Sequence, residues 1–213
     1  MKSFLVIGAG KFGHFVCHRL NKSGCDIMIV DRSEEKLSDM LTYVDSAKIG
    51  DCTKSSVLGA FGVEAFDAAI VCIPEDFQDS LQIVDLLKEL GAKNVIAVAS
   101  TMVQEKFLLK NGADKVILPE RDMASRLAMS ISYDSIFDYI NLTDQYSIYE
   151  LAAPKEWLNK TILEVNVRKN YDINIVAIKR DANNIIMPDV SYTFNDKDHL
   201  MVIGKIEDIE RLI

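Results

Sequence analysis

The residues best suited to chemistry lie near the N-terminus and form a glycine-rich run, Gly8-Ala9-Gly10-Lys11-Phe12-Gly13. The spacing is G-x-G-x-x-G, and the run follows a short apolar segment and opens an amphipathic one. Glycine at these positions permits a tight turn, lets the backbone approach a phosphate and lets the following helix pack closely on the strand. The free N–H groups at the start of that helix attract an anion. The sequence therefore predicts a phosphate-binding loop.

Two charged side chains extend this prediction to a nucleotide. Asp31 ends the next apolar segment, where a carboxylate accepts hydrogen bonds from both ribose hydroxyls and repels an additional phosphate on the ribose. Lys11 belongs to the glycine loop, and its long cationic side chain suits a terminal phosphate. We therefore expect an adenosine nucleotide with an unmodified ribose. The alternatives are a solvated aspartate beside a glycine turn and a solvated surface lysine.

Other polar residues allow two interpretations each. Asp51 follows the third predicted strand, where the crevice at the carboxyl ends of the strands would receive adenine; capping of the next helix explains it equally well. His14 and His18 stand four residues apart on a predicted helix, which lets two imidazoles share a metal, but the sequence offers no third ligand nearby. His199 lies in a predicted turn and has no expected chemical role.

The catalytic sets that would indicate an enzyme are not found. A nicotinamide dehydrogenase needs a proton donor or acceptor beside the hydride, and the three histidines are poor candidates. The last 70 residues contain neither a Ser-His-Asp set nor an H-E-x-x-H motif. The sequence therefore favours a non-enzymatic protein. An NAD-dependent oxidoreductase with a minimal substrate domain is the alternative, and a redox-sensing transcriptional regulator would require a basic DNA-binding element that the sequence lacks.

The first 120 residues alternate short β-branched runs with longer amphipathic ones, which predicts βαβ units and a parallel, Rossmann-like α/β sheet with helices on both faces. The predicted strands are 3–7, 26–30, 47–49, 68–73, 94–98 and 115–118. The predicted helices are 11–21, 33–43, 77–90 and 102–111, with a weaker one at 54–59.

After Pro119 the pattern changes. Residues 123–132 and 136–140 read as a helix, a break and a second helix, which suits a linker or a dimerisation arm. Further on, the sequence predicts strands at 146–151, 173–179, 185–187 and 200–203 with a helical turn at 161–165, and so a small α+β domain. We therefore predict a nucleotide-binding domain at 1–120, a helix-turn-helix dimerisation linker at 121–143 and a C-terminal domain at 144–213. The small core of the last domain favours oligomerisation.

Composition limits the partners. The 213 residues include 24 basic and 32 acidic ones, and the net charge of −8 repels nucleic acid and anionic lipid. No apolar run approaches the roughly 20 residues needed to cross a bilayer, and the N-terminus lacks the sections of a secretory signal. Four separate cysteines without a C-x-x-C pair suit a reducing cytosol. We expect a cytoplasmic protein whose membrane role, if it has one, acts through a partner.

The whole chain resembles the RCK family, the regulators of potassium conductance, and within it the KtrA, KtrC and TrkA type of subunit that gates a membrane potassium transporter. In the N-terminal half the resemblance rests on the glycine loop, Asp31-Arg32, Gly50-Asp51 and residues 118–124. In the C-terminal half it rests on residues 157–165, 167–171, 175–180 and 196–204. The chain departs from the family's pattern at Pro74, where glycine or alanine is common, and at Lys11, where arginine is common.

The resemblance implies a nucleotide sensor. It implies ATP or ADP in the N-terminal site, with NAD as an alternative ligand, and an Mg²⁺ or Ca²⁺ ion held by Glu120 at the phosphates; the alternative for Glu120 is a helix cap. It also implies a homodimer formed through the helices after Glu120, and an eight-membered ring beneath a transporter subunit of the KtrB or TrkH kind. The expected site comprises Gly8, Ala9, Gly10, Lys11, Phe12, Gly13, Asp31, Arg32, Asp51, Cys52, Ile73 and Glu120.

A second ligand, cyclic di-AMP, is implied for the C-terminal domain at a symmetric dimer interface. A two-fold symmetric ligand suits such an interface because each half of it meets the same residues. Arg168 would bind a phosphate, and Asn174 with the backbone near Ile175 would bind the purine edge. The apolar surfaces for the base would be Ile162, Leu163 and Pro188. The alternative is that these six are ordinary residues of the fold.

Overall fold

The computed structural model describes residues 1–143, 145–181 and 184–212, and of Asp181 the backbone alone. The chain forms two compact units, Met1–Arg121 and Asp122–Ile213. No helix among the described residues has the length and apolar character required to span a bilayer.

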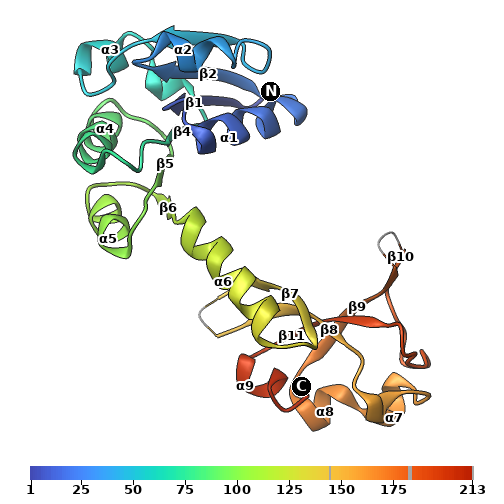
Figure 1. The fold of residues 1–213 in the computed structure, drawn as a ribbon. Coiled ribbons are helices and arrows are strands. Elements are labelled where there is room, and N and C mark those ends of the chain that lie inside the picture. Colours follow the sequence, from blue (N-terminus) through green and yellow to red (C-terminus); the bar gives the residue numbers. More distant parts are fainter. Residues whose placement is uncertain (144, 182–183, 213) are drawn as a thin grey trace. The chain divides into compact units, whose positions relative to one another are not determined.

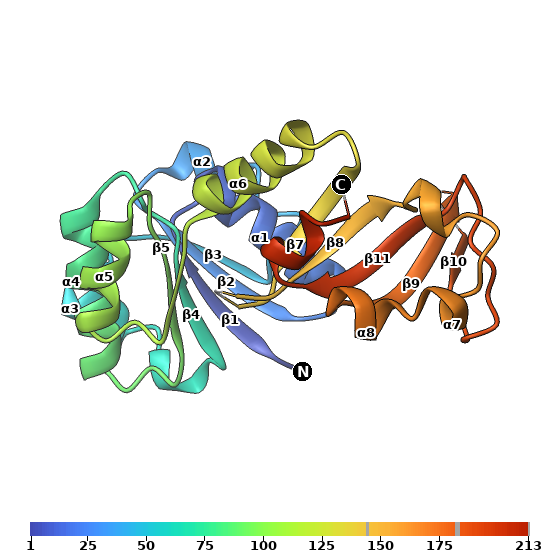
Figure 2. The same ribbon diagram turned by 90° about the horizontal axis from the view of Figure 1, so that it is seen from below.

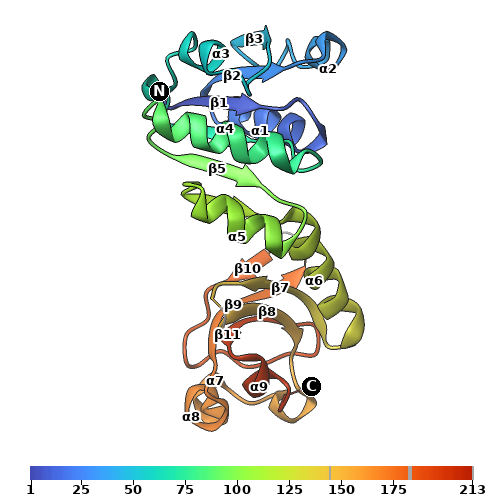
Figure 3. The same ribbon diagram turned by 90° about the vertical axis from the view of Figure 1, so that its left-hand side faces the viewer.

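The first unit is built on a six-stranded parallel sheet with the order β3-β2-β1-β4-β5-β6. The predicted Rossmann-like sheet is confirmed, and Figure 3 shows β3, β2 and β1 side by side in the blue part of the ribbon. Each strand lies within one or two residues of its predicted range. The strands are β1 (Ser3–Ile7), β2 (Asp26–Asp31), β3 (Ser46–Ile49), β4 (Ala68–Val71), β5 (Val95–Val98) and β6 (Lys115–Ile117).

Helices cover both faces of this sheet and create two apolar cores. Successive strand residues point to opposite faces, so Leu5 and Ile7 enter one core while Val6, between them, enters the other. The first core is covered by α3 (Ser55–Gly59), α4 (Phe77–Glu89) and α5 (Met102–Lys110), and the second by α1 (Lys11–Lys22) and α2 (Glu34–Ser38). A short 3-10 helix, η1 (Val63–Ala65), precedes β4.

Short polar side chains fix where these helices begin. The Ser33 hydroxyl accepts a hydrogen bond from the Lys36 N–H at the start of α2, and Asp76 and Thr101 cap α4 and α5 in the same way. The prediction of a helix through residue 43 was too long, because α2 ends at Ser38 and turns follow it. Met40 is fully buried in those turns, so its apolar character reflects tertiary packing and not a further helical turn.

The second unit is a five-stranded antiparallel sheet with the order β10-β9-β11-β8-β7, as Figure 2 shows. Its core surrounds Trp157 and Phe194, and the predicted α+β domain is confirmed. The short helices α8 and α9 were not predicted, because one turn of helix is too short for an apolar period. The elements are β7 (Ile136–Asn141), β8 (Ser147–Ala152), η2 (Lys155–Trp157), α7 (Ile162–Val165), α8 (Val167–Tyr171), β9 (Asn174–Asp181), β10 (Asn184–Ile186), β11 (His199–Gly204) and α9 (Ile206–Ile209).

The predicted helix-turn-helix linker is half wrong. Its first helix is present as α6 (Pro119–Ser132), which begins four residues earlier than predicted. The second predicted helix, 136–140, is the strand β7, paired with β8 from Ile136 to Asn141. A run of six β-branched, aromatic and polar residues is ambiguous by itself, and here an available strand edge decided its conformation.

Candidate functional site

The predicted nucleotide site lies at the carboxyl ends of β1, β2 and β4. The chain runs from β1 outward to β2 and β3 on one side, then returns to add β4 on the other side of β1. A crevice opens where the strand order reverses in this way. The glycine loop joins β1 to α1 at this point. Figure 1 shows the start of α1 beside the ends of these strands.

The three glycines of the loop have different physical roles. Gly8 has a φ of +103°, and a Cβ there would lie 2.7 Å from the Cys72 carbonyl oxygen. A Cβ on Gly13 would lie 2.1 Å from the Gly8 carbonyl oxygen, so the close approach of α1 to β1 requires glycine. Gly10 is different, since the nearest atom to its Cβ position is the Cys72 carbonyl oxygen at 4.0 Å. The space that a side chain would fill at Gly10 is available to a ligand.

Asp31 ties the loop to the end of β2. Its Oδ2 accepts a hydrogen bond from the Ala9 N–H at 2.7 Å, and its Oδ1 accepts one from the Ser33 N–H at 2.8 Å. A carboxylate offers about four acceptor positions, and these two bonds leave the others for ribose hydroxyls. Asp31 therefore positions the loop and keeps acceptor positions free for a ligand.

Arg32 and Asp51 form an ion pair beside the site. The Arg32 Nη2 lies 2.6 Å from the Asp51 Oδ1, which also accepts hydrogen bonds from the Thr53 hydroxyl at 2.6 Å and the Thr53 N–H at 3.1 Å. The Thr53 hydroxyl, followed by Arg32, lowers the Asp51 pKa from its ordinary value to about 2. Asp51 is not the cap of α3, since that helix begins after Lys54 without a side-chain cap.

Two cavities flank the glycine loop within the first unit. The smaller, of about 340 Å³, has Gly8, Asp31 and Ile73 on its walls; the larger, of about 710 Å³, has Gly10, Lys11 and Glu120. Lys36, on the first turns of α2, lines both. An adenosine against Asp31 in the smaller cavity would thus direct its phosphates toward Gly10 and the two lysines.

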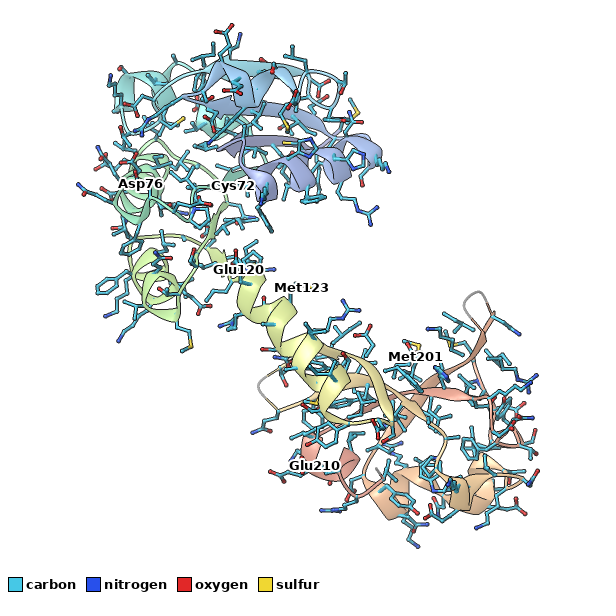
Figure 4. All side chains as sticks on the ribbon, in the orientation of Figure 1. Cys72, Asp76, Glu120, Met123, Met201 and Glu210 are labelled. Carbon is cyan, nitrogen blue, oxygen red and sulfur yellow. The ribbon has the colours of Figure 1, made fainter. Side chains whose placement is uncertain are left out.

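The structure gathers most of the predicted residues around these cavities. The smaller cavity takes Gly8, Asp31, Arg32, Cys52 and Ile73, and the larger takes Ala9, Gly10, Lys11, Phe12 and Glu120. Gly13 and Asp51 line neither cavity. Gly13 packs against the Gly8 carbonyl group, and Asp51 forms an ion pair with Arg32, which does line the smaller cavity. Several wall residues that follow β2 and β4 were not among the predicted ones, although the rule that ligands lie at the carboxyl ends of parallel strands indicates them. They include Ser33, Lys36, Asp76, Asp79 and Ile83. Figure 4 marks Cys72 directly after β4, Asp76 at the start of α4 and Glu120 at the start of α6.

Cysteines and histidines near the loop have structural surroundings. Burial raises the pKa of the Cys17 and Cys52 thiols to about 12, so both are neutral. His14 and His18 each pack edge-on against the Tyr43 ring, with centroids 5.4 Å and 5.3 Å away. Among the residues that the structure describes, no three of the types His, Cys, Asp and Glu are grouped to hold a metal.

A third cavity, of about 280 Å³, lies in the second unit. All six residues predicted for a second ligand line it, together with Asn166, Asp189 and others. Arg168 and the largely exposed Leu163 come from α8 and α7, while Asn174 and Ile175 come from β9. The cavity therefore combines a cation, an amide and apolar surface, as a ligand with a phosphate and a base would require.

His199, which was expected to have no chemical role, belongs to a packed cluster outside these cavities. Its ring lies 3.9 Å from the Phe137 ring and parallel to it, and its Nδ1 lies 2.9 Å from the Glu150 Oε1. Lys179 approaches the same carboxylate at 2.9 Å. The cluster links four strands of the second sheet, β7, β8, β9 and β11.

Comparison with known proteins finds relatives along the whole chain. Residues 4–119 match the TrkA-N domain and residues 146–213 match the TrkA-C domain. Over 210 residues the chain is 39% identical to Ktr system potassium uptake protein C of Bacillus subtilis strain 168, covering 99% of this chain and 95% of that protein. It is 36% identical to Ktr system potassium uptake protein A of the same strain, with the same coverage.

Solved structures show the same fold at lower identity. The RCK domain of GsuK superposes over 100% of this chain and 47% of its own, with a TM-score of 0.69 and 17% identity. The GsuK channel bound to NAD superposes over 99% of this chain and 38% of its own, with a TM-score of 0.73 and 16% identity. These likenesses support the two-unit fold.

Proposed function

The chain belongs to the family of proteins that carry a TrkA-N domain followed by a TrkA-C domain, and from that premise we propose that it is a non-enzymatic regulatory subunit of a potassium uptake system. The observation that carries the proposal is the end-to-end similarity to Ktr system potassium uptake protein C, which includes both domains. The partner is a membrane potassium transporter subunit of the KtrB or TrkH kind, and the protein acts at the cytoplasmic face of that subunit.

The first unit is proposed to sense ATP and ADP. Asp31 suits a ribose, the open space at Gly10 suits a phosphate, and Lys11 and Lys36 supply positive charge on the larger cavity. NAD shares the adenosine half of these ligands and so competes for the smaller cavity. A nucleotide shifts the assembly between two shapes only through a difference in its affinity for each shape, so the triphosphate and the diphosphate must bind the two shapes unequally.

Glu120 is proposed to hold a cation at the phosphates. It is exposed at the start of α6 and shares the larger cavity with Lys11. A carboxylate that faces a triphosphate is repelled unless a cation lies between them, and Mg²⁺ or Ca²⁺ takes oxygen ligands from both. Glu120→Gln is expected to reduce the metal dependence of ATP binding, and unchanged metal dependence would exclude this role.

The subunit is proposed to form dimers through α6 and a ring of eight chains. α6 contains no buried residue, and Met123, Leu127 and Ile131 are exposed at four-residue spacing along it, which places them on one side of the helix. Exposed large apolar side chains in such a stripe indicate a surface that a second chain covers.

Cyclic di-AMP is proposed as the ligand of the third cavity, at a symmetric interface of two C-terminal domains. Titration of the full-length protein with cyclic di-AMP should show saturable binding that Arg168→Ala weakens. Arg168→Lys should weaken it too, because lysine cannot reproduce the two parallel hydrogen bonds of a guanidinium to phosphate. Absence of binding to the unmodified protein would assign the domain a structural role only.

The proposed function is tested on the same variants by titration calorimetry for binding, by mass photometry for assembly and by a transport assay. ATP and ADP should each bind the full-length protein in titration calorimetry, and they should change the shape or mass of the assembly differently. Co-expression with a transporter subunit in a strain deficient in potassium uptake should restore growth at low potassium. Variants that no longer bind nucleotide should lose the nucleotide-dependent control of potassium uptake. NAD turnover with a substrate would instead favour an oxidoreductase.

A further inference from the structure

Arg32 is held at both ends of its guanidinium group by carboxylates from different parts of the fold. Its Nε and Nη2 donate to the Asp51 Oδ1 at 3.1 Å and 2.6 Å, and its Nη1 lies 2.7 Å from the Asp79 Oδ2. Arg32 follows β2, Asp51 lies between β3 and α3, and Asp79 belongs to α4. The network therefore joins three elements around the smaller cavity.

The two carboxylates are themselves fixed. The Asp51 side chain is held by both the N–H and the hydroxyl of Thr53, and the loop that carries it is joined to α4 by the Gln82 side chain, which donates to the Thr53 carbonyl oxygen at 3.0 Å. The Asp79 side chain is only 20% exposed. Exposed ion pairs contribute little to stability, so stabilisation of the fold does not account for two anchors on one half-exposed arginine.

This arrangement determines what Arg32 offers to a ligand. The N–H groups lie along the edge of the guanidinium plane, and the carboxylates occupy that edge. The two flat faces of the guanidinium plane remain available to a ligand. Guanidinium planes stack on aromatic rings and on nucleobases.

The cavity that Arg32 lines has a shape and chemistry that suit a flat base. Ile73 and Ile83 give it apolar walls, and Cys52 adds a thiol that burial keeps neutral. Its three carboxylates, Asp31, Asp76 and Asp79, outnumber its two cations, Arg32 and Lys36, and this balance disfavours a phosphate there. The positive charge of Arg32 is already matched by two carboxylates, so a phosphate gains little from it.

We infer that Arg32 is the base-stacking residue of the nucleotide site, and that Asp51 and Asp79 are positioning residues that hold the guanidinium plane across the base. The inference rests on the proposed nucleotide-binding function. It assigns Arg32 to the base and leaves the phosphates to the glycine loop and the lysines of the larger cavity.

Binding of ADP, ATP and UDP to the full-length protein tests this assignment. Arg32→Met keeps an unbranched apolar side chain but removes the guanidinium plane, and it should weaken ADP and ATP by the same factor, on the order of 10-fold to 100-fold for one lost stacking partner. The preference for ADP over UDP should fall, because a purine stacks over more area than a pyrimidine. Asp79→Asn should cause a smaller loss, since Asp51 still holds one end.

Arg32→Lys distinguishes the contribution of the flat guanidinium plane from that of the positive charge. A lysine keeps the charge but has no flat face and cannot donate to Asp51 and Asp79 together, so it should bind ADP as weakly as Arg32→Met; full rescue by lysine would overturn the inference. Lys54→Met is the matched control, because Lys54 also faces Asp51, with its Nζ 3.8 Å from Oδ2, and does not line the cavity. Its ADP affinity should stay within about 2-fold of the unmodified protein.

The remaining outcomes separate this inference from the proposed function. Unchanged ADP affinity in Arg32→Met, or a selective loss of ATP, would overturn the stacking role and leave nucleotide sensing in place. Failure of the unmodified protein to bind any adenine nucleotide would overturn both. Thermal unfolding without nucleotide should be nearly the same for Arg32→Met and the unmodified protein, so that the binding losses are not those of a misfolded chain.

Discussion

Asp31 shows how one carboxylate can serve both the fold and a ligand. It accepts two short hydrogen bonds from backbone N–H groups, one in the glycine loop and one at the start of α2. The same group lines the smaller cavity. The loop is thereby positioned before any ligand arrives, which reduces the ordering cost of binding.

We expect Asp31→Ala to weaken ATP and ADP equally, by about 1.5 to 3 kcal/mol, the usual range for hydrogen bonds to a charged group. Titration calorimetry measures this loss. Asp67→Ala is the matched control, because the Asp67 Oδ2 accepts a hydrogen bond from the Ser3 N–H at 2.8 Å at the start of the same sheet. Both changes should lower the stability of the fold, but only Asp31→Ala should lower the affinity for nucleotide. If the two variants bind ATP and ADP equally well, Asp31 does not contact the nucleotide.

At the scale of elements, the turn between β1 and α1 depends on two glycines for opposite reasons. Gly13 must lack a Cβ because helix and strand are in contact there, whereas Gly10 has free space and an ordinary φ of −73°. The first is a requirement of packing, and the second is an opening toward a ligand.

Substitution by alanine should separate these two requirements. Gly13→Ala should destabilise the first unit by about 1 to 3 kcal/mol, the usual cost of forcing an extra methyl group into a packed contact. Gly10→Ala should leave the thermal midpoint nearly unchanged and weaken nucleotide binding, since the new methyl group occupies the space at the phosphates. Denaturant unfolding and calorimetry on both variants check this, and a stable Gly13→Ala protein would contradict the packing argument.

The Asp114 carboxylate, just before β6, joins α4 to the start of β5. The Val95 N–H donates to it at 2.7 Å and Lys88 pairs with it at 3.0 Å. The hydrogen bond from Val95, followed by the Lys88 ammonium, lowers the Asp114 pKa below its ordinary 3.8. Folding therefore favours the ionised form of this side chain.

This shift gives a pH dependence of a definite sign. Because folding lowers the pKa, the stabilisation is complete above the unfolded pKa near 3.8 and is lost as the pH falls through the folded value. Asp114→Asn should be less stable than the unmodified protein at pH 7, and the difference should shrink as the pH falls below the unfolded pKa near 3.8. Thermal unfolding between pH 7 and pH 2 measures this, with Asp85→Asn, an exposed position on α4, as the control. A difference that grows on acidification would contradict the assignment.

At the scale of the whole molecule, α6 carries the surface that is proposed to bind a second chain. No residue of α6 is buried, although Met123, Leu127 and Ile131 are large and apolar. Water contact with such a stripe is unfavourable, and burial against another copy removes it.

Leu127→Glu should therefore convert the proposed dimer to a monomer, because the charge would be buried without a partner in the interface. Ser125→Glu is the control, since two residues along the helix turn the new carboxylate about 200° away from the stripe. Analytical ultracentrifugation separates the two outcomes. A dimeric Leu127→Glu protein would show that another surface joins the chains.

The amino-acid sequence by itself determined the features that local patterns specify. The strands of the first unit, the glycine loop and the position of Asp31 all follow from period, turn chemistry and the rule that sites lie at the carboxyl ends of parallel strands. The α+β character of the second unit followed from its short strands. These predictions succeeded because each depends on a few neighbouring residues.

The tertiary structure decided what depends on contacts between distant residues. It made β7 a strand because an edge of β8 was available to pair with it, and it buried Met40 in turns that had been expected to be helical. It also brought Asp51 and Asp79 to the two ends of one guanidinium group. No local pattern specifies such a contact, because it exists only when a parallel sheet gathers the ends of its strands at one edge.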